Sequence, residues 1–224
     1  MSRSLEGRIV VVTGANGALG RAVRQRLRDA GATPVGLDLQ ADAGGEVLAA
    51  DLSDAAATEK AVGQILSRHG RIDALLSIAG GFRMAPATDV AAWDAMWKMN
   101  LATALNAARA VLPSMTQRGA GSIVSVAARA GALPAGAGMG AYAASKGAVI
   151  RLTEALSEEV KNQGVRVNCV MPSIIDTEAN RRSMPDADFG KWVRPEALAD
   201  VLLFLCSDAA AAITGAAIPV YGRA

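Results

Sequence analysis

Two kinds of hydrophobic pattern alternate along the whole chain, and this alternation limits the folds that it can adopt. Short runs of branched apolar residues, such as "RIVVVT", are typical of buried parallel strands. They occupy residues 8–13, 33–38, 46–51, 73–80, 122–128, 165–172 and 216–220. Apolar residues recur at helical spacing over 19–31, 55–68, 89–118, 142–162 and 195–206. We therefore expect an α/β fold with a mostly parallel seven-stranded sheet and helices on both of its faces.

No feature of the sequence divides this pattern into parts. The 224 residues contain no linker, internal repeat or low-complexity segment, so we expect a single domain spanning 1–224. In the first helix, Leu19, Val23 and Leu27 share one face. The four arginines of that helix are expected to form a solvated surface.

Charge and cysteine content narrow the functional classes. The chain has 23 basic and 21 acidic residues, and this near balance predicts no nucleic-acid partner. Cys169 and Cys206 lie in apolar runs without metal-ligand spacing, so we expect reduced core thiols, no metal site and a cytoplasmic protein. No apolar run is long enough to cross a membrane, and residues 1–10 are too polar for a signal peptide, so no membrane association is expected.

The segment "VVVTGANGALGRAV" joins the first expected strand to the first helix. It places Gly14, Gly17 and Gly20 in the connecting turn. Glycines let the backbone turn tightly and approach a pyrophosphate, whose charge then faces the N–H groups at the helix start. This context predicts a Rossmann-type, doubly wound domain that binds a dinucleotide.

Asp38 closes the second expected strand, about 20 residues beyond the glycine loop. A carboxylate there accepts hydrogen bonds from the adenosine ribose and repels a 2′-phosphate. No arginine or lysine stands at 15–18 or 39–41, so the sequence favours NAD(H) over NADP(H). Asp51, at the end of the third strand, either contacts the adenine edge or caps the following helix.

Tyr142 and Lys146 lie four residues apart in "AYAASKGA", which is one turn of a helix. A phenol with a pKa near 10 is a poor base at neutral pH unless a cation stabilises the phenolate. The pair therefore indicates an acid–base site, although such pairs also occur on ordinary solvated helices.

Together with further motifs, these features resemble the short-chain dehydrogenase/reductase family over nearly the full length. The motifs are the glycine loop, "DL" at 51–52, "AG" at 79–80, "KMNL" around Asn100, "YAASK" at 142–146 and "MPSIIDT" at 171–177. The resemblance implies that Tyr142 exchanges a proton with the substrate, that Lys146 lowers the tyrosine pKa and binds the nicotinamide ribose, and that Asn100 orders a relay water. It also implies a homodimer or homotetramer.

The same resemblance implies a set of contacts to NAD(H). The expected residues are Gly14, Asn16, Gly17, Ala18, Leu19, Gly20, Asp38, Leu39, Asp51, Leu52, Ala79, Gly80, Gly81, Tyr142, Lys146, Pro172, Ile175 and Thr177.

One expected group is missing from the pattern. Family members usually carry a serine after the fifth strand that holds the substrate oxygen, and alignment of "IVSVAARAG" puts Ala128 there. Ser125 is three residues upstream, which is about 10 Å along a strand, and the odd offset points it to the opposite face. Arg129 is a weaker stand-in donor. Loss of one such donor costs roughly 3 to 4 kcal/mol of transition-state stabilisation, which a substrate with a conjugated ring tolerates best.

Dihydropteridine reductases, which use NADH to reduce quinonoid dihydrobiopterin, form a branch of the family that also lacks the serine. The chain resembles them in "GALG" (17–20), "AGGF" (79–82), "MWK" (96–98), "GMGAYAASKGAV" (138–149) and "DTEANRRSMPDADFGKW" (176–192). The last stretch falls where the family places its substrate lid, here 176–193. A lid closing over a flat ring would exclude water.

The expected substrate contacts are Phe82, Ala128, Met139 and Met184. The chain is thus expected to be an NADH-dependent reductase of a small molecule such as quinonoid dihydropteridine. The end of the chain, "TGAAIPVYGRA", looks more like bacterial family members that act on ordinary substrates. The alternatives are therefore a carbonyl or alcohol oxidoreductase, and a non-catalytic NAD(H) sensor or scaffold.

Two surface features carry less weight. The helices expected at 89–118 and 142–162 are rich in alanine, and either pair across a two-fold axis or pack on the sheet. His69, the single histidine, ends a helix and is expected to be solvated without a catalytic role.

Overall fold

The computed structural model describes residues 5–224, and residues 1–4, part of the segment tested for a signal peptide, lie outside the described residues. Its centre is a seven-stranded sheet with the strand order β3-β2-β1-β4-β5-β6-β7. Each neighbouring pair is parallel. The strands are β1 (Ile9–Thr13), β2 (Thr33–Asp38), β3 (Val47–Ala49), β4 (Ala74–Ser77), β5 (Gly121–Val126), β6 (Val165–Pro172) and β7 (Ala217–Val220). The predicted fold class is confirmed.

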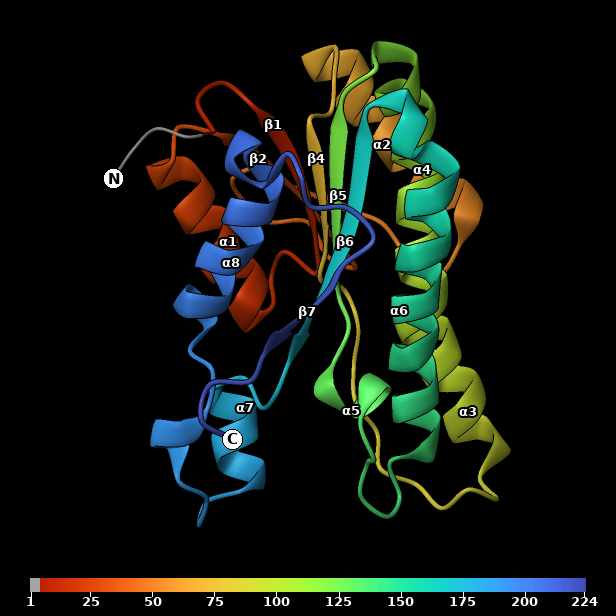
Figure 1. Ribbon diagram of the computed structural model, residues 1–224, viewed down its shortest axis with the longest axis vertical. Helices are drawn as coiled ribbons and strands as arrows, with labels where there is room; N and C mark the ends of the chain where they lie inside the picture. The colour runs from red at the N-terminus through yellow and green to blue at the C-terminus, as the bar shows by residue number, and fades with distance from the viewer. Residues whose placement is uncertain (1–4) are drawn as a thin grey trace.

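Helices cover both faces of this sheet (Figure 1). The α-helices are α1 (Ala18–Asp29), α2 (Ala55–His69), α3 (Val90–Met96), α4 (Thr103–Arg118), α5 (Arg129–Ala132), α6 (Gly140–Val160), α7 (Glu178–Ser183) and α8 (Pro195–Cys206). Four further helical segments are η1 (Trp97–Ala102), η2 (Lys161–Gln163), η3 (Phe189–Lys191) and η4 (Asp208–Ala210).

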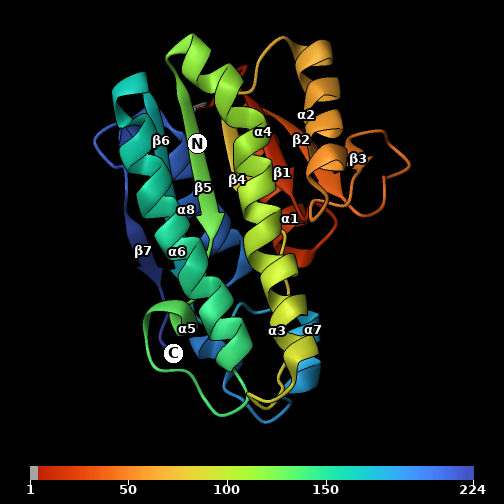
Figure 2. The ribbon, with the colours of Figure 1, turned by 90° about the vertical axis from the view of Figure 1, so that its right-hand side faces the viewer.

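Two apolar layers hold the helices to the sheet. On one face, Val23 and Leu27 of α1 and Leu202 of α8 lie in one buried cluster with strand residues. On the other face, Val62 of α2 and Val111 of α4 belong to a second cluster, to which α6 also contributes. Figure 2 shows α2, α4 and α6 lying side by side over that face. Because the strands are parallel, their carboxyl ends meet at one edge of the sheet, the lower edge in Figure 1.

Local signals explain several boundaries. The Asp54 carboxylate accepts the N–H groups of Ala56 and Ala57 and so caps α2, which ends at Gly70 in the left-handed region (φ 76°). Pro195 occupies the first turn of α8, where its missing N–H costs nothing. The short helices α5 and α7 were not predicted, because neither is long enough to show a helical repeat.

The helix predicted over 89–118 is interrupted. Residues Trp97–Ala102 form a π-helical segment between α3 and α4, and Asn100 lies within it, 1% exposed. A π-helical turn adds a residue to the helix and re-aims the side chains beside it, and such turns often mark functional sites. Hydrophobic spacing cannot reveal this change, because the apolar face continues on both sides.

The expectation that all four arginines of the first helix are solvated is wrong for Arg24. Arg24 is only 7% exposed, and its guanidinium pairs with Asp42 at 3.0 Å and Glu46 at 2.7 Å. Arg28 also bonds Glu46 and lowers the pKa of that carboxyl. The two acids come from the loop between β2 and β3, which folds back over α1, a long-range contact that helical spacing does not encode.

Two smaller expectations concern cysteine and membranes. Cys169 and Cys206 are free thiols, and both are buried, as predicted. Among residues 5–224, no helix combines the length and apolar character needed to span a membrane.

Candidate active site

The glycine loop between β1 and α1 is packed so closely that side chains cannot enter it. Gly14 adopts φ +64°, and a Cβ there would lie 3.0 Å from the backbone of Ala79. A Cβ on Gly20 would lie 2.2 Å from the carbonyl oxygen of Gly14. Gly17 is the N-cap of α1 and has no side chain to occupy the first-turn N–H groups, which include those of Ala18 and Leu19. These features fit a bound pyrophosphate.

Asp38 is fixed at the end of β2 beside this loop. Its carboxylate oxygens accept the N–H groups of Asn16 at 2.9 Å and Leu39 at 2.8 Å. The Asn16 side-chain amide donates to the carbonyl of Gln40 at 2.8 Å and ties the loop to the same strand end. Each carboxylate oxygen keeps a lone pair for a ribose hydroxyl, so the position fits the adenosine half of a dinucleotide.

A cation lies beside the same loop. The exposed Arg21 guanidinium donates to the carbonyl of Asn16. Arg21 lies outside positions 15–18 and 39–41 and reaches back from the first turn of α1, so the spacing of charges in the sequence does not reveal it. Arg21 therefore bears on the choice between NAD(H) and NADP(H).

The turn after β3 contains the next two expected contacts. The Asp51 carboxylate accepts the Ser53 hydroxyl at 2.6 Å and the Ser53 N–H at 2.9 Å, and these bonds lower the pKa of Asp51. Asp54, not Asp51, caps α2, so the helix-cap alternative for Asp51 does not apply. The carbonyl of Leu52 accepts the side-chain amide of buried Asn106 at 3.0 Å. This bond holds the turn after β3 in place, and no motif in the sequence indicates it.

Asn100 brings three segments together. Its Oδ1 accepts the N–H of Gly81 at 2.9 Å, while its Nδ2 donates to the carbonyl of Gly81 at 3.1 Å and to the Ser145 hydroxyl at 3.0 Å. A Cβ on Gly80 would lie 2.6 Å from Asn100 Oδ1 and 3.3 Å from Lys146 Nζ. The π-helical segment thus places Asn100 beside α6, and Gly80 of the "AG" motif leaves room for the contact.

Tyr142 and Lys146 both lie on α6, and burial shifts both pKa values. Burial raises the pKa of Tyr142 to about 12 and lowers that of Lys146 to about 8, with the Cys169 thiol partly opposing the lysine shift. Lys146 Nζ donates to the carbonyl of Val126 at 2.8 Å. The tyrosine shift is opposite to the one expected from the pair alone. At neutral pH the phenol keeps its proton and the ammonium stays charged, a state suited to proton donation.

Tyr142 contacts an exposed aromatic ring. Phe82 is 55% exposed, and its ring meets that of Tyr142 edge-on, with centroids 4.9 Å apart and an interplanar angle of 86°. Ala128 follows β5 as the extended N-cap of α5 and is buried. Ser125 lies inside the sheet, with Ser77 and Cys169 as its register neighbours. Ser125 therefore does not reach the position at Ala128.

The expected lid, 176–193, is folded. Thr177 caps α7 through the N–H of Asn180, and Asp176 forms two bonds of 2.6 and 2.7 Å with Arg181. The Arg181 guanidinium lies 4.8 Å from the centre of the Phe189 ring, which packs at 4.8 Å on Trp192. Met139 and Met184 are half-buried, and Ile175, after Pro172, bridges to Val193.

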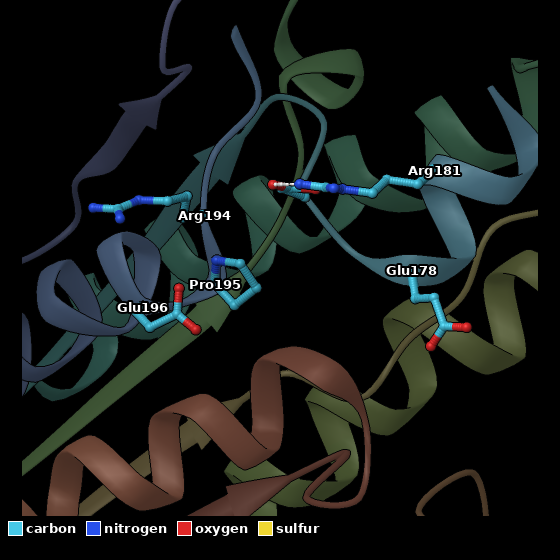
Figure 3. A pocket seen from close by; sticks show the side chains of 6 residues that line it. Glu178, Arg181, Arg194, Pro195 and Glu196 are labelled. Atoms are coloured by element: carbon cyan, nitrogen blue, oxygen red, sulfur yellow. Dashed lines mark hydrogen bonds and ion pairs between the residues drawn. The ribbon is translucent and has the colours of Figure 1, made fainter. Parts of the chain in front are cut away.

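A cavity of about 390 Å³ separates the lid from the start of α8 (Figure 3). Its lining residues are Asp176, Glu178, Arg181, Arg194, Pro195 and Glu196. In Figure 3, α1 passes below these side chains. Neither the glycine loop nor Tyr142 lines this cavity.

Comparison with known proteins places the whole chain in one family. Residues 8–188 match the model for short chain dehydrogenases. D-threitol dehydrogenase of Mycolicibacterium smegmatis is 32% identical, over 97% of this chain and 93% of that protein. The 3-oxoacyl-[acyl-carrier-protein] reductase FabG of Thermotoga maritima is 30% identical, over 97% and 98%. The crystal structure of levodione reductase superposes with a TM-score of 0.90 at 26% identity and covers 97% of both chains.

These three names do not refer to dihydropteridines, so the narrower resemblance is not supported by them. The broader resemblance is confirmed. By its glycine loop, its Tyr142–Lys146 pair and its full-length relatives, this chain is a member of the short-chain dehydrogenase/reductase family, whose enzymes are oxidoreductases that bind NAD(P)(H).

Proposed function

We propose that this protein is an NADH-dependent reductase that adds hydride to a conjugated ring, such as a quinonoid dihydropteridine, with Tyr142 as the proton donor. The observation that carries this proposal is the substrate side of the tyrosine. Ala128 presents a methyl group where a serine hydroxyl would hold a substrate oxygen, and the exposed Phe82 ring lies beside Tyr142.

Bound NADH would supply the hydride. Asp38 would hold the adenosine ribose, and the N–H groups after Gly17 would bind the pyrophosphate. Tyr142, whose pKa of about 12 keeps it protonated, would give its proton to the reduced ring. Lys146, buried beside Asn100, would then stabilise the phenolate and pass it a proton, and Lys146 would be reprotonated from solvent through an Asn100-bound water.

A site with a single proton donor suits a conjugated acceptor better than it suits a simple ketone. Hydride addition to a ketone concentrates negative charge on one oxygen, where each missing hydrogen-bond donor costs roughly 3 to 4 kcal/mol. In a conjugated ring the charge spreads over several atoms. Less charge then lies on any one atom, so proton donation by Tyr142 alone is sufficient. The flat Phe82 ring supports the same class of substrate, because aromatic rings pack on one another.

A second candidate is a carbonyl or alcohol oxidoreductase. The names of the relatives favour it, since they include a D-threitol dehydrogenase and a 3-oxoacyl reductase.

A third candidate is a non-catalytic NAD(H) sensor. The retention of Tyr142, Lys146 and Asn100 together argues against it, because nucleotide binding alone does not need the phenol. In each case we propose a cytoplasmic homodimer or homotetramer, which light scattering would measure.

The deciding experiment measures NADH oxidation with quinonoid dihydropterin generated in situ, beside a panel of neutral ketones, with NADPH as the nucleotide control. We expect fast NADH-dependent reduction of the dihydropterin, lowered by about 10³-fold in Tyr142→Phe with NADH affinity retained. Turnover of ketones alone would select the second candidate. Tight NADH binding without any turnover would select the sensor.

A further inference from the structure

Arg129 lies at the substrate side without an anionic partner. It is the first residue of α5, directly after Ala128, and it is exposed. Its guanidinium lies 5.4 Å from the centre of the Tyr221 ring. No hydrogen bond or ion pair joins that guanidinium to a carboxylate in the described chain. An arginine held on an aromatic ring keeps its donors free for a further group.

The backbone places this cation over the edge where the strands end. Arg129 follows β5, Tyr221 follows β7, and the strand between them, β6, ends at Pro172. The Ser173 hydroxyl donates to the carbonyl of Tyr221 at 2.6 Å. This bond ties the segment that carries the Tyr221 ring to the residues just before the lid. Ligands of open α/β sheets bind at this edge. Arg129 therefore lies at the edge of the sheet where we expect the substrate to bind.

The same helix is locked to the catalytic helix. A Cβ on Gly131 would lie 2.7 Å from the carbonyl carbon of Lys146 and from the N–H nitrogen of Gly147. This close contact holds α5, which begins with Arg129, beside α6, which carries Tyr142 (Figure 1). A substrate group that binds Arg129 would therefore set the position of the reacting atom at the tyrosine.

Three other arginines near this end of the sheet differ from Arg129 in having carboxylate partners. Arg83 pairs with Asp89 at 2.8 Å, Arg181 pairs with Asp176 at 2.6 Å, and Arg182 bonds Glu178. Their charges are compensated within the protein, whereas the Arg129 charge is not. A guanidinium in this state matches a carboxylate or sulfonate through paired hydrogen bonds.

We propose that Arg129 is a specificity-determining residue that binds an anionic group of the substrate, so that this enzyme prefers conjugated substrates carrying a carboxylate or sulfonate. The inference rests on the proposed function, since it assumes reduction at Tyr142. It adds a preference among conjugated acceptors for those that carry an anionic group, which neither the fold nor the family membership implies.

The test compares 4-formylbenzoate with its neutral methyl ester, two aldehydes that share a conjugated ring, each reduced with NADH and with NADPH. In the unaltered enzyme we expect a lower KM for the acid. Arg129→Gln should raise the KM of the acid about tenfold or more and leave that of the ester unchanged, because it removes a charged hydrogen-bond donor. Arg129→Lys should recover part of the preference, and Arg83→Gln, the matched control, should retain it.

Three results would overturn the proposal. Equal KM values for acid and ester in the unaltered enzyme would do so, as would a preference that survives Arg129→Gln. An equal loss for both substrates together with a lower Tm would assign Arg129 to holding Tyr221 only. If neither aldehyde is reduced, the proposed function is in question, and calorimetry with benzoate and benzamide on the nucleotide-loaded protein decides the Arg129 inference. Tighter benzoate binding that Arg129→Gln abolishes supports it, and equal binding refutes it.

Discussion

The nucleotide end and the substrate end of the site are built in different ways. At the nucleotide end, backbone groups take part in each contact: the Gly14 carbonyl leaves no space for a Cβ on Gly20, and the Asp38 carboxylate accepts the backbone N–H groups of Asn16 and Leu39. At the substrate end, side chains meet side chains, as in the ring contact of Phe82 with Tyr142 and the ion pair of Asp176 with Arg181. Changes at the first end should therefore abolish binding of any nucleotide, and changes at the second should alter substrate choice.

The largest expected effect comes from adding one methyl group to the nucleotide end. Gly20→Ala would place a Cβ 2.2 Å from the Gly14 carbonyl oxygen, so the loop must move. We expect roughly 1 to 3 kcal/mol lower stability and NADH binding weakened by about 100-fold, because the loop N–H groups lose the pyrophosphate. Urea unfolding and calorimetric titration with NADH measure these two quantities.

Gly63 supplies the matched control. It lies on the exposed face of α2 with nothing within 4 Å of an added Cβ. Gly63→Ala should stabilise the protein by about 0.5 to 1 kcal/mol and leave NADH binding unchanged. If Gly20→Ala behaves like Gly63→Ala, the loop is not the nucleotide site.

At the substrate end, restoring the hydroxyl should change substrate choice rather than binding of the nucleotide. Ala128→Ser would add a donor at the buried N-cap of α5. We expect turnover of neutral ketones to rise about tenfold, because an alkoxide gains a second hydrogen bond. Turnover of dihydropterin should hardly change. Steady-state rates with both substrates provide the measurement, and an unchanged ketone rate would count against a role for position 128.

The choice of nucleotide sharpens the comparison further, because it depends on charges rather than on backbone packing. Asp38→Asn removes the carboxylate that would face a 2′-phosphate, while Arg21 remains beside Asn16. We expect the ratio of NADPH to NADH efficiency to rise about fivefold, which corresponds to roughly 1 kcal/mol of charge repulsion. Arg21→Gln in the same background should reverse part of that gain. Unchanged kcat/KM ratios in both variants would place the discrimination elsewhere.

The last expected effect is a pH dependence of stability. Burial lowers the pKa of Lys146 from 10.5 to about 8, so between these values the unfolded chain binds a proton that the folded chain lacks. Unfolding free energy from this group therefore rises with pH across that window. The pKa of Tyr142, raised from 10.0 to about 12, acts in the opposite direction above pH 10. Urea unfolding between about pH 8 and 9.5 should show that Lys146 makes the unfolding free energy rise with pH, and Lys146→Met should remove this part of the slope. An identical slope in the variant would contradict the assignment.

Much of the fold followed from local pattern. The strand predicted at 33–38 is β2, and the helix predicted at 195–206 is α8, because buried parallel strands and amphipathic helices carry their periods in the residues themselves. The strand predicted at 73–80 ends earlier, at Ser77, since the glycines after it belong to the site. The π-helical turn around Asn100 stayed hidden, because its cause is a contact with Gly81 and Ser145 from other segments.

The sequence by itself determined the family and the order of the elements, and it predicted the residues of the candidate site, because glycine loops and the Tyr142–Lys146 spacing are local features. Tertiary structure alone decided that Arg24 is buried, that Arg21 reaches the glycine loop and that Arg129 lies over the Tyr221 ring without a carboxylate partner among residues 5–224. The physical reason is shared by all three. The environment of a charge is set by the groups that folding brings to it from distant parts of the chain.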